Sequence, residues 1–196
     1  MIRHLAVLAL VLVTPAGLSA QHGATGAEAH LAPPEARQFD FLIGQWELTV
    51  KPKATSLAAR IHGAPRLVGT WKAWKAFDGW GIEDELRIMD RSGNPMALVH
   101  YLRGYDLAAR RWILTGFDAY RGRITGATAA WDGHEMVTNG RSSDDDPTPQ
   151  LTRSRLTGIE ADRFVMHQDR SADGGKSWDR DVLVIEAKRI AAGAPR

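Results

Sequence analysis

The chain has 196 residues, with 25 Lys and Arg residues against 23 Asp and Glu residues, and it contains no cysteine. This near balance of charge excludes the strongly basic surface that is typical of nucleic-acid-binding proteins and of proteins held on anionic membranes. Without cysteine there is no disulfide to constrain the unfolded state, so packing must stabilise the fold. We expect the seven tryptophans to supply much of that packing.

The first 20 residues have the features of a secretory signal peptide. Arg3 and His4 precede an uncharged apolar run at residues 5–13, and small residues follow as far as Ala20. The run is far shorter than the roughly 20 residues of a membrane-spanning helix, so we expect cleavage after Ser19 or Ala20 and no membrane span. The alternative is a buried N-terminal helix. We therefore predict an exported protein, periplasmic or extracellular, that is soluble after cleavage.

Removal of residues 1–20 leaves 196 minus 20, or 176, residues, which is enough for one domain with a substantial core. Residues 21–37 are rich in Ala, Gly, His and Pro and show no sustained period, which predicts a flexible lead. Order is expected to begin near Phe39. The folded domain is predicted to span residues 38–190.

Short apolar and aromatic runs alternate with turn sequences through the rest of the chain, which is typical of an all-β protein. In the clearest strand, residues 80–89, apolar and charged residues alternate with a period of two. Further strands are predicted at residues 45–51, 66–77, 96–105, 111–119, 123–131, 135–140, 150–158, 163–170 and 177–188. Residues 52–65 interrupt the pattern and are expected to hold a short helix or a flap. About ten strands predict an antiparallel meander β-barrel, because closure removes exposed sheet edges.

Residues 39–48, which read FDFLIGQWEL, resemble the opening of a bacterial family of exported proteins of unknown function. Within them, Gly44-x-Trp46 is similar to the lipocalin signature, and the resemblance extends to residues 101–106 and 171–178. In lipocalin-like and nitrobindin-like barrels this Trp lies where the first strand enters, and it closes the barrel floor. The resemblance therefore implies a calycin-like barrel in which Gly44 and Trp46 are structural.

Residues 171–178 read SADGGKSW and match the Asp-box of sialidase-like propellers. Ser171 and Asp173 are expected to satisfy turn amides, and Trp178 is expected to hold the hairpin against the core. A propeller would repeat the motif in each blade, whereas here it occurs once. The motif therefore predicts a structural hairpin, and a sialidase is the disfavoured alternative.

A candidate ligand site follows from the hairpin around residues 91–94. A loop there would place Asp84 opposite Tyr101 and Trp80 opposite Tyr105, with Arg103 one diagonal step from Asp84 on the apolar face. We expect the two charges to pair inside the barrel among these aromatic residues, as a site that orients a polar group requires. The alternatives are an ion pair that only fixes register, or a face turned outward by a one-residue slip.

His167 is the histidine to consider for haem, because nitrobindin-like barrels hold haem iron through a His on a late strand. No motif around it matches that family, so the resemblance assigns it no role, and a satisfied surface or core histidine is the preferred interpretation. The spacing of the histidines is not typical of a metal site. Residues 144–146, three aspartates, lack the glycine and the distal glutamate of a calcium loop, so we expect no metal.

Taken together, these features predict an exported protein that binds a small apolar or amphipathic molecule inside a β-barrel. One alternative is a hydrolase or isomerase in which Asp84 is the general acid or base, Arg103 stabilises an anion and Tyr101 donates a hydrogen bond. A haem-binding barrel and a purely structural role are further alternatives. The chain has no Gly-x-Ser-x-Gly motif and no cysteine for nucleophilic chemistry. The sequence leaves the oligomeric state open.

Overall fold

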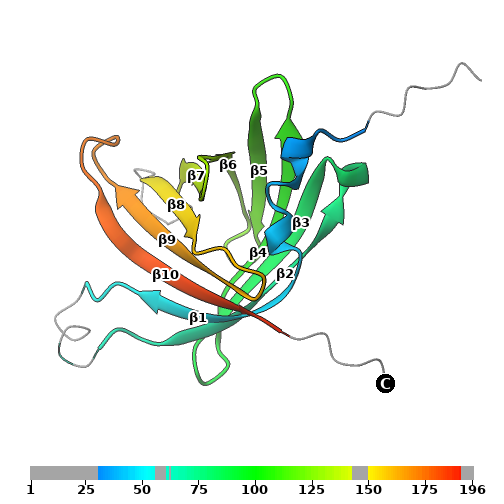
Figure 1. Ribbon diagram of the computed structural model, residues 1–196. Helices are drawn as coiled ribbons and strands as arrows, with labels where there is room; N and C mark the ends of the chain where they lie inside the picture. The colour runs from blue at the N-terminus through cyan, green and yellow to red at the C-terminus, as the bar shows by residue number, and fades with distance from the viewer. Residues whose placement is uncertain (1–30, 56–60, 62, 143–149, 191–196) are drawn as a thin grey trace, which may run out of the picture. The chain divides into compact units, whose positions relative to one another are not determined.

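The computed structural model describes residues 31–55, 61, 63–142 and 150–190. Within them, ten strands follow one another as an antiparallel meander that closes into a barrel, with β1 paired to both β2 and β10 (Figure 1). The predicted fold class, an all-β calycin-like barrel of about ten strands, is therefore confirmed. The signal peptide predicted at residues 1–20 lies outside the described residues, as do residues 56–60 and 62 of the helix or flap predicted within residues 52–65.

Each predicted strand corresponds to one observed strand, with ends shifted by at most two residues. The strands are β1 (Gly44–Pro52), β2 (Leu67–Ala76), β3 (Gly81–Met89), β4 (Pro95–Asp106), β5 (Arg111–Asp118), β6 (Arg123–Trp131), β7 (Met136–Arg141), β8 (Leu151–Thr157), β9 (Arg163–Ser171) and β10 (Asp179–Arg189). Three 3₁₀ helices, η1 (Pro34–Arg37), η2 (Asp40–Leu42) and η3 (Phe77–Gly79), were not predicted. Secondary structure begins before Phe39, because η1 starts at Pro34 and buries Ala36.

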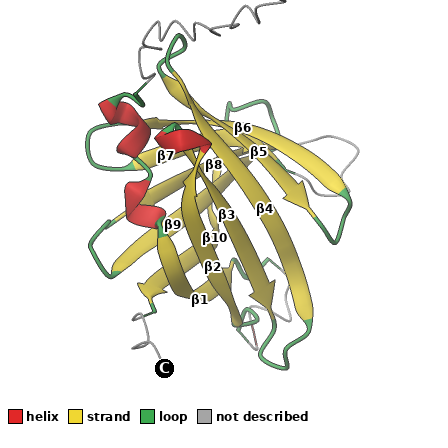
Figure 2. Cartoon of the chain, turned by 90° about the vertical axis from the view of Figure 1, so that its right-hand side faces the viewer, coloured by secondary structure: helices red, strands yellow, loops and turns green. Residues whose placement is uncertain are grey.

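Aromatic side chains close one end of the barrel, where β1 begins and β10 ends; we call it the closed end. Trp46 and Phe164 lie 4.8 Å apart between ring centres, as do Phe39 and Trp112, and both contacts are edge-to-face. All four side chains are at most 1% exposed. The three short helices gather beside this end (Figure 2). Such edge-to-face pairs add roughly 0.5–1.5 kcal/mol each beyond the area that they bury.

The opposite end of the barrel, formed by the turns at residues 90–94, 119–122 and 172–178, is the mouth. In the last of these turns Asp173 accepts hydrogen bonds from the backbone N–H and the hydroxyl of Ser177 and from the hydroxyl of Ser171. The indole of Trp178 packs against the guanidinium of Arg153 on the outer face of β8. The central carbon of that guanidinium lies 4.4 Å from the ring centre of Trp178. The hairpin therefore rests on the outer surface of the barrel, whereas the sequence predicted contact with the core.

The β3–β4 register agrees with the prediction from the hairpin at residues 91–94. Asp84 lies opposite Tyr101 and Ile82 lies opposite Arg103. The register shifts by one residue between Ile88 and Met89, next to the turn. Trp80 lies just before β3, and its carbonyl accepts the N–H of Tyr105 at 3.0 Å. Asp84, Tyr101 and Arg103 consequently face the barrel interior. No helix within the described residues is long and apolar enough to cross a membrane.

Candidate functional site

A cavity of about 250 Å³ lies inside the barrel and reaches the mouth, where Arg121 and Ser142 line it. Sites for drug-sized ligands measure roughly 300–1,000 Å³. The cavity is a little smaller than this range, and the barrel interior is compatible with binding a small ligand. Its apolar lining includes Trp71, Leu86, Ala97, Val99, Leu114, Leu156, Met166, Leu183 and Ile185.

A buried ion pair joins β3 to β4 at the inner end of this cavity. Asp84 is 0% exposed and Arg103 is 4% exposed. The Nε of Arg103 donates to Oδ2 of Asp84, and its Nη2 donates to Oδ1 at 3.0 Å. Trp71 donates from its indole N–H to the same Oδ1 at 2.7 Å. Because a buried carboxylate is tolerated only when it is paired and hydrogen bonded, these three donors explain how Asp84 can lie in the core.

Aromatic rings enclose the guanidinium of Arg103. Its central carbon lies 4.9 Å from the ring centre of Tyr101, 5.0 Å from that of Phe39 and 5.9 Å from that of Trp71, within the range of cation–π contacts. Asp84 uses the Nε and Nη2 donors. Within residues 31–55, 61, 63–142 and 150–190, no group accepts a hydrogen bond from Nη1. Arg103 lines the cavity, and Nη1 is the guanidinium nitrogen that Asp84 does not occupy.

The position of Tyr101 depends on Gly116, which lies opposite it on β5. A Cβ atom at Gly116 would lie 2.6 Å from Cε1 of Tyr101 and 2.9 Å from Oγ1 of Thr125, so only glycine leaves room for the ring. Burial raises the pKa of the Tyr101 hydroxyl, and the positive charge of Arg103 offsets part of this rise. The hydroxyl is therefore a protonated donor at neutral pH. No partner for it is found in the described part of the chain.

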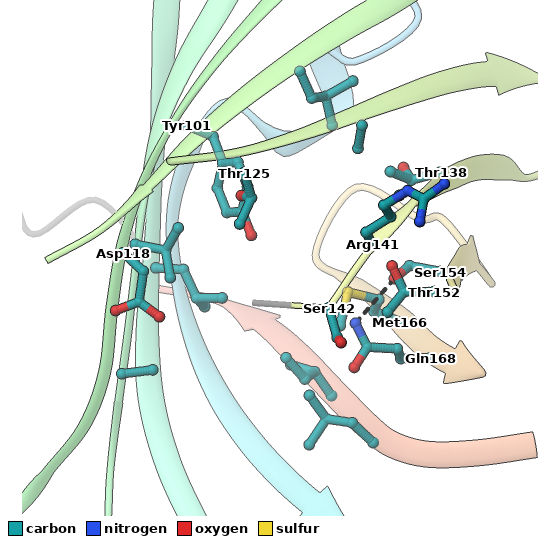
Figure 3. Close-up of a pocket in the computed structure, with 18 of the residues that line it drawn as sticks. Tyr101, Asp118, Thr125, Thr138, Arg141, Ser142, Thr152, Ser154, Met166 and Gln168 are labelled. Atoms are coloured by element: carbon teal, nitrogen blue, oxygen red, sulfur yellow. Dashed lines mark hydrogen bonds between the residues drawn. The ribbon is translucent and has the colours of Figure 1, made fainter. Parts of the chain in front are cut away.

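Strands β7, β8 and β9 form the part of the lining that faces Tyr101 across the cavity, and they contribute Arg141, Arg170, Leu156, Met166 and four uncharged polar side chains (Figure 3). The four uncharged polar residues, here called the polar wall, are Thr138, Thr152, Ser154 and Gln168. Thr138 pairs with Ser154 across β7 and β8, and Ser154 pairs with Gln168 across β8 and β9. One cross-strand row therefore places three of these side chains beside one another.

Asp118 belongs to the turn at the mouth although it also lines the cavity. It is 3% exposed and accepts the backbone N–H groups of Tyr120 at 3.1 Å and Arg121 at 3.2 Å. The guanidinium of Arg121 donates to its other oxygen at 2.8 Å. These contacts occupy the carboxylate, so its main effect is to fix the connection between β5 and β6.

Of the five residues predicted for the ligand site, Asp84, Tyr101 and Arg103 come together as expected. Trp80 and Tyr105 do not line the cavity. Tyr105 packs against Trp112 at the closed end, with 5.6 Å between ring centres. The aromatic residues that enclose the ion pair therefore come from β2 and from the segment before β1, in addition to Tyr101.

Trp71, Gly116 and the polar wall were not predicted from the sequence. Two features of the sequence could have identified Trp71. Alternation in β2 would place Trp71 on the inward face, and pairing β2 to β3 through the turn at residues 77–80 would bring Trp71 beside Asp84. Gly116 is a glycine within a strand, which often marks the close approach of another group. The polar wall gave no such signal, because Thr and Ser at inward positions remove the apolar alternation on which strand faces are assigned.

His167 lies on the outer face of β9, between the inward-facing Met166 and Gln168. Its Nδ1 lies 2.9 Å from Oδ1 of Asp181. Within the described residues no histidine lines the cavity, so the residues present do not fit a haem that is held inside the barrel through a histidine. In the same residues no group of three or more His, Asp or Glu side chains is arranged to hold a metal ion.

The geometry of Asp84 bears on the alternative of an enzyme. Three donors use its two carboxylate oxygens, and Trp71 and Arg103 separate it from the cavity, which Asp84 itself does not line. A general acid or base must reach the proton that it transfers, directly or through one water molecule. The observed arrangement instead suits a residue that orients Arg103.

The chain matches no model of a known protein family, and no curated protein sequence matches it.

Proposed function

We propose that the protein binds a small amphipathic ligand inside the barrel, with a polar group of the ligand held by Arg103 and Tyr101. The observation that carries the proposal is that Arg103 and Tyr101 both line the cavity, while Nη1 of Arg103 and the hydroxyl of Tyr101 have no partner in the described chain. Asp84 and Trp71 fix the guanidinium, so the site is preorganised and little side-chain freedom is lost on binding.

The apolar lining supports the amphipathic character of the ligand. Leu86, Leu114, Leu156 and Ile185 surround the space next to the donors, where an apolar part of the ligand would displace water. The small volume of about 250 Å³ favours a compact molecule, or one that leaves part of itself at the mouth. The apolar lining and the small volume both select a ligand, and neither acts on the ligand chemically. We therefore propose binding and no catalytic step.

The proposal includes export to the periplasm or the medium. Its support is the run at residues 1–20, with a basic start, a short apolar stretch and small residues before the expected cleavage site. The resemblance of residues 39–48 to the opening of a family of exported proteins points the same way. Amino-terminal sequencing of the protein taken from the cell envelope tests this part, with Gln21 or Ala20 expected as the first residue.

Native mass spectrometry of the protein, purified gently from the cells that make it, tests the binding. We expect a stoichiometric bound mass in the wild type. The Tyr101→Phe variant keeps the ring and loses the hydroxyl, and we expect its affinity for that ligand to fall about three- to tenfold. Tyr105→Phe is the matched control, because Tyr105 packs at the closed end and does not line the cavity. A bare protein that also binds no small amphipathic molecule in titrations would rule the function out.

A further inference from the structure

The polar wall constrains which ligand would fit. Thr138, Ser154 and Gln168 form one cross-strand row, and Thr152 follows in the next row toward the mouth, opposite Gly140. All four line the cavity. A Cβ atom at Gly140 would lie 3.0 Å from Cβ of Ala127 and 3.4 Å from Oγ1 of Thr152, so glycine at this position lets β6, β7 and β8 approach closely beside Thr152.

Most of the hydrogen-bonding capacity of this wall is unused within the described chain. Its side chains share one long contact, in which the amide of Gln168 donates to the hydroxyl of Ser154 at 3.5 Å. In residues 31–55, 61, 63–142 and 150–190, the hydroxyls of Thr138 and Thr152 have no hydrogen-bond partner. A hydroxyl or amide that loses water without gaining a partner costs roughly 1–3 kcal/mol. A ligand that covers this wall must therefore replace the water.

The facing part of the cavity has a different character. There β3 and β4 contribute Leu86, Ala97 and Val99. Figure 3 shows the polar wall on one side of the space and Tyr101 with Thr125 on the other. Polar partners are thus needed along the edge of the ligand that faces the polar wall and near Tyr101 and Thr125, while Leu86, Ala97 and Val99 offer apolar contact.

We infer that the ligand is a compact ring compound that carries two or more hydroxyl or carbonyl groups along one edge; this inference rests on the proposed function. A straight-chain amphiphile has one polar end. Such a molecule would satisfy Arg103 and Tyr101 but would press its methylene groups against the polar wall. Hydroxyl and amide side chains both donate and accept, so they match hydroxyl and carbonyl oxygens alike. The cavity volume of about 250 Å³ lies below the usual range for drug-sized ligands, which favours a single substituted ring.

The test is a titration of the protein with two sets of probes of similar size, followed by calorimetry or by tryptophan fluorescence. The ring set is ethylbenzene, 4-ethylphenol and 4-ethylcatechol, which differ by successive hydroxyl groups on one edge of the ring. The chain set is 1-octanol and octanoate. We expect affinity to rise about three- to tenfold with each hydroxyl that finds a partner, and 4-ethylcatechol to bind more tightly than either chain probe.

Variants of the wall separate this inference from the general function. Thr138→Val and Ser154→Ala remove one hydroxyl each, and we expect both to reduce the gain from ethylbenzene to 4-ethylcatechol without weakening ethylbenzene. Thr115→Val is the matched control, because Thr115 points outward from β5. If the chain probes bind as tightly as 4-ethylcatechol, the inference is wrong and the binding function stands. If no probe of either set binds, both are wrong.

Discussion

The guanidinium of Arg189 lies over the indole of Trp46, with 4.0 Å between its central carbon and the ring centre. The same guanidinium donates to the carbonyl oxygens of Phe41 at 3.0 Å, Ile43 at 2.7 Å and Ala161 at 2.6 Å. Trp46 in turn donates from its indole N–H to the carbonyl of Leu42 at 2.8 Å. One contact between the first and last strands therefore anchors the segment that closes the barrel.

The first prediction concerns this anchor. Trp46→Ala should lower the free energy of unfolding by about 3–5 kcal/mol, because it leaves a cavity among Phe39, Phe164 and Trp71. Arg189→Lys should lower it by about 1–3 kcal/mol, because one ammonium group cannot reach three carbonyl oxygens held in different directions. Urea unfolding measures both. Lys188→Arg, on the exposed face of β10, is the control, and a Trp46→Ala protein as stable as this control would contradict the role of the anchor.

The strands and the β3–β4 register could be predicted because their signals are local. In β3 the apolar residues Ile82, Leu86 and Ile88 alternate with charged ones, and the loop at residues 91–94 then fixes which residues face each other. Closure of the barrel also followed from the number of strands, which leaves no edge unpaired once β1 meets β10.

What could not be predicted depends on contacts between segments distant in sequence. Phe39 reaches Arg103 only because η1 and η2 fold back over the closed end, and no pattern in residues 31–43 specifies that path. In β8, which reads LTRSRLT, polar side chains occupy both faces, so alternation cannot tell which of them face inward. His167 lies late in the chain, but it alternates with inward-facing neighbours on β9, so its side chain points outward toward Asp181.

The second prediction concerns the buried pair of Asp84 and Arg103. Asp84→Asn should destabilise the protein by about 3–5 kcal/mol, because it leaves the guanidinium buried without its counter-charge. The double variant Asp84→Leu, Arg103→Met should recover much of this loss, since paired apolar replacements avoid the unmatched charge. Urea unfolding of Asp84→Leu, of Arg103→Met and of the double variant gives the coupling free energy between the two positions. Coupling near zero would show that the two residues do not depend on each other.

The third prediction concerns the space that Gly116 leaves for Tyr101. Gly116→Ala should destabilise the protein by about 1–3 kcal/mol, because the new methyl group would lie 2.6 Å from the Tyr101 ring and must displace it into the cavity. Adding Tyr101→Ala should remove most of this strain, so the effect of Gly116→Ala should be smaller in the Tyr101→Ala background. Thermal unfolding of the four proteins measures the difference. Equal effects in both backgrounds would mean that the ring does not occupy the space above Gly116.

The last prediction concerns the turn at residues 171–178 and its dependence on pH. The pKa of Asp173 is lowered from 3.8 to about 2, chiefly because the backbone N–H of Ser177 donates to it, with the hydroxyls of Ser177 and Ser171 as further donors. The unfolded state therefore takes up a proton at a higher pH than the folded state. The stabilisation is complete above pH 4 to 5 and is lost as the pH falls toward 2.

Asp173→Asn lacks this titration, so its stability deficit relative to the wild type should be constant between about pH 5 and 7 and should shrink between about pH 4 and 2. Urea unfolding followed by tryptophan fluorescence at each pH measures the deficit. Ser177→Ala removes one of the hydroxyl donors and keeps the backbone N–H, so it should show a weaker change over the same range. A deficit that stays constant down to pH 2 would show that the charge of Asp173 contributes nothing to the turn. The hairpin would then depend on hydrogen-bond geometry alone, which Asn reproduces in part.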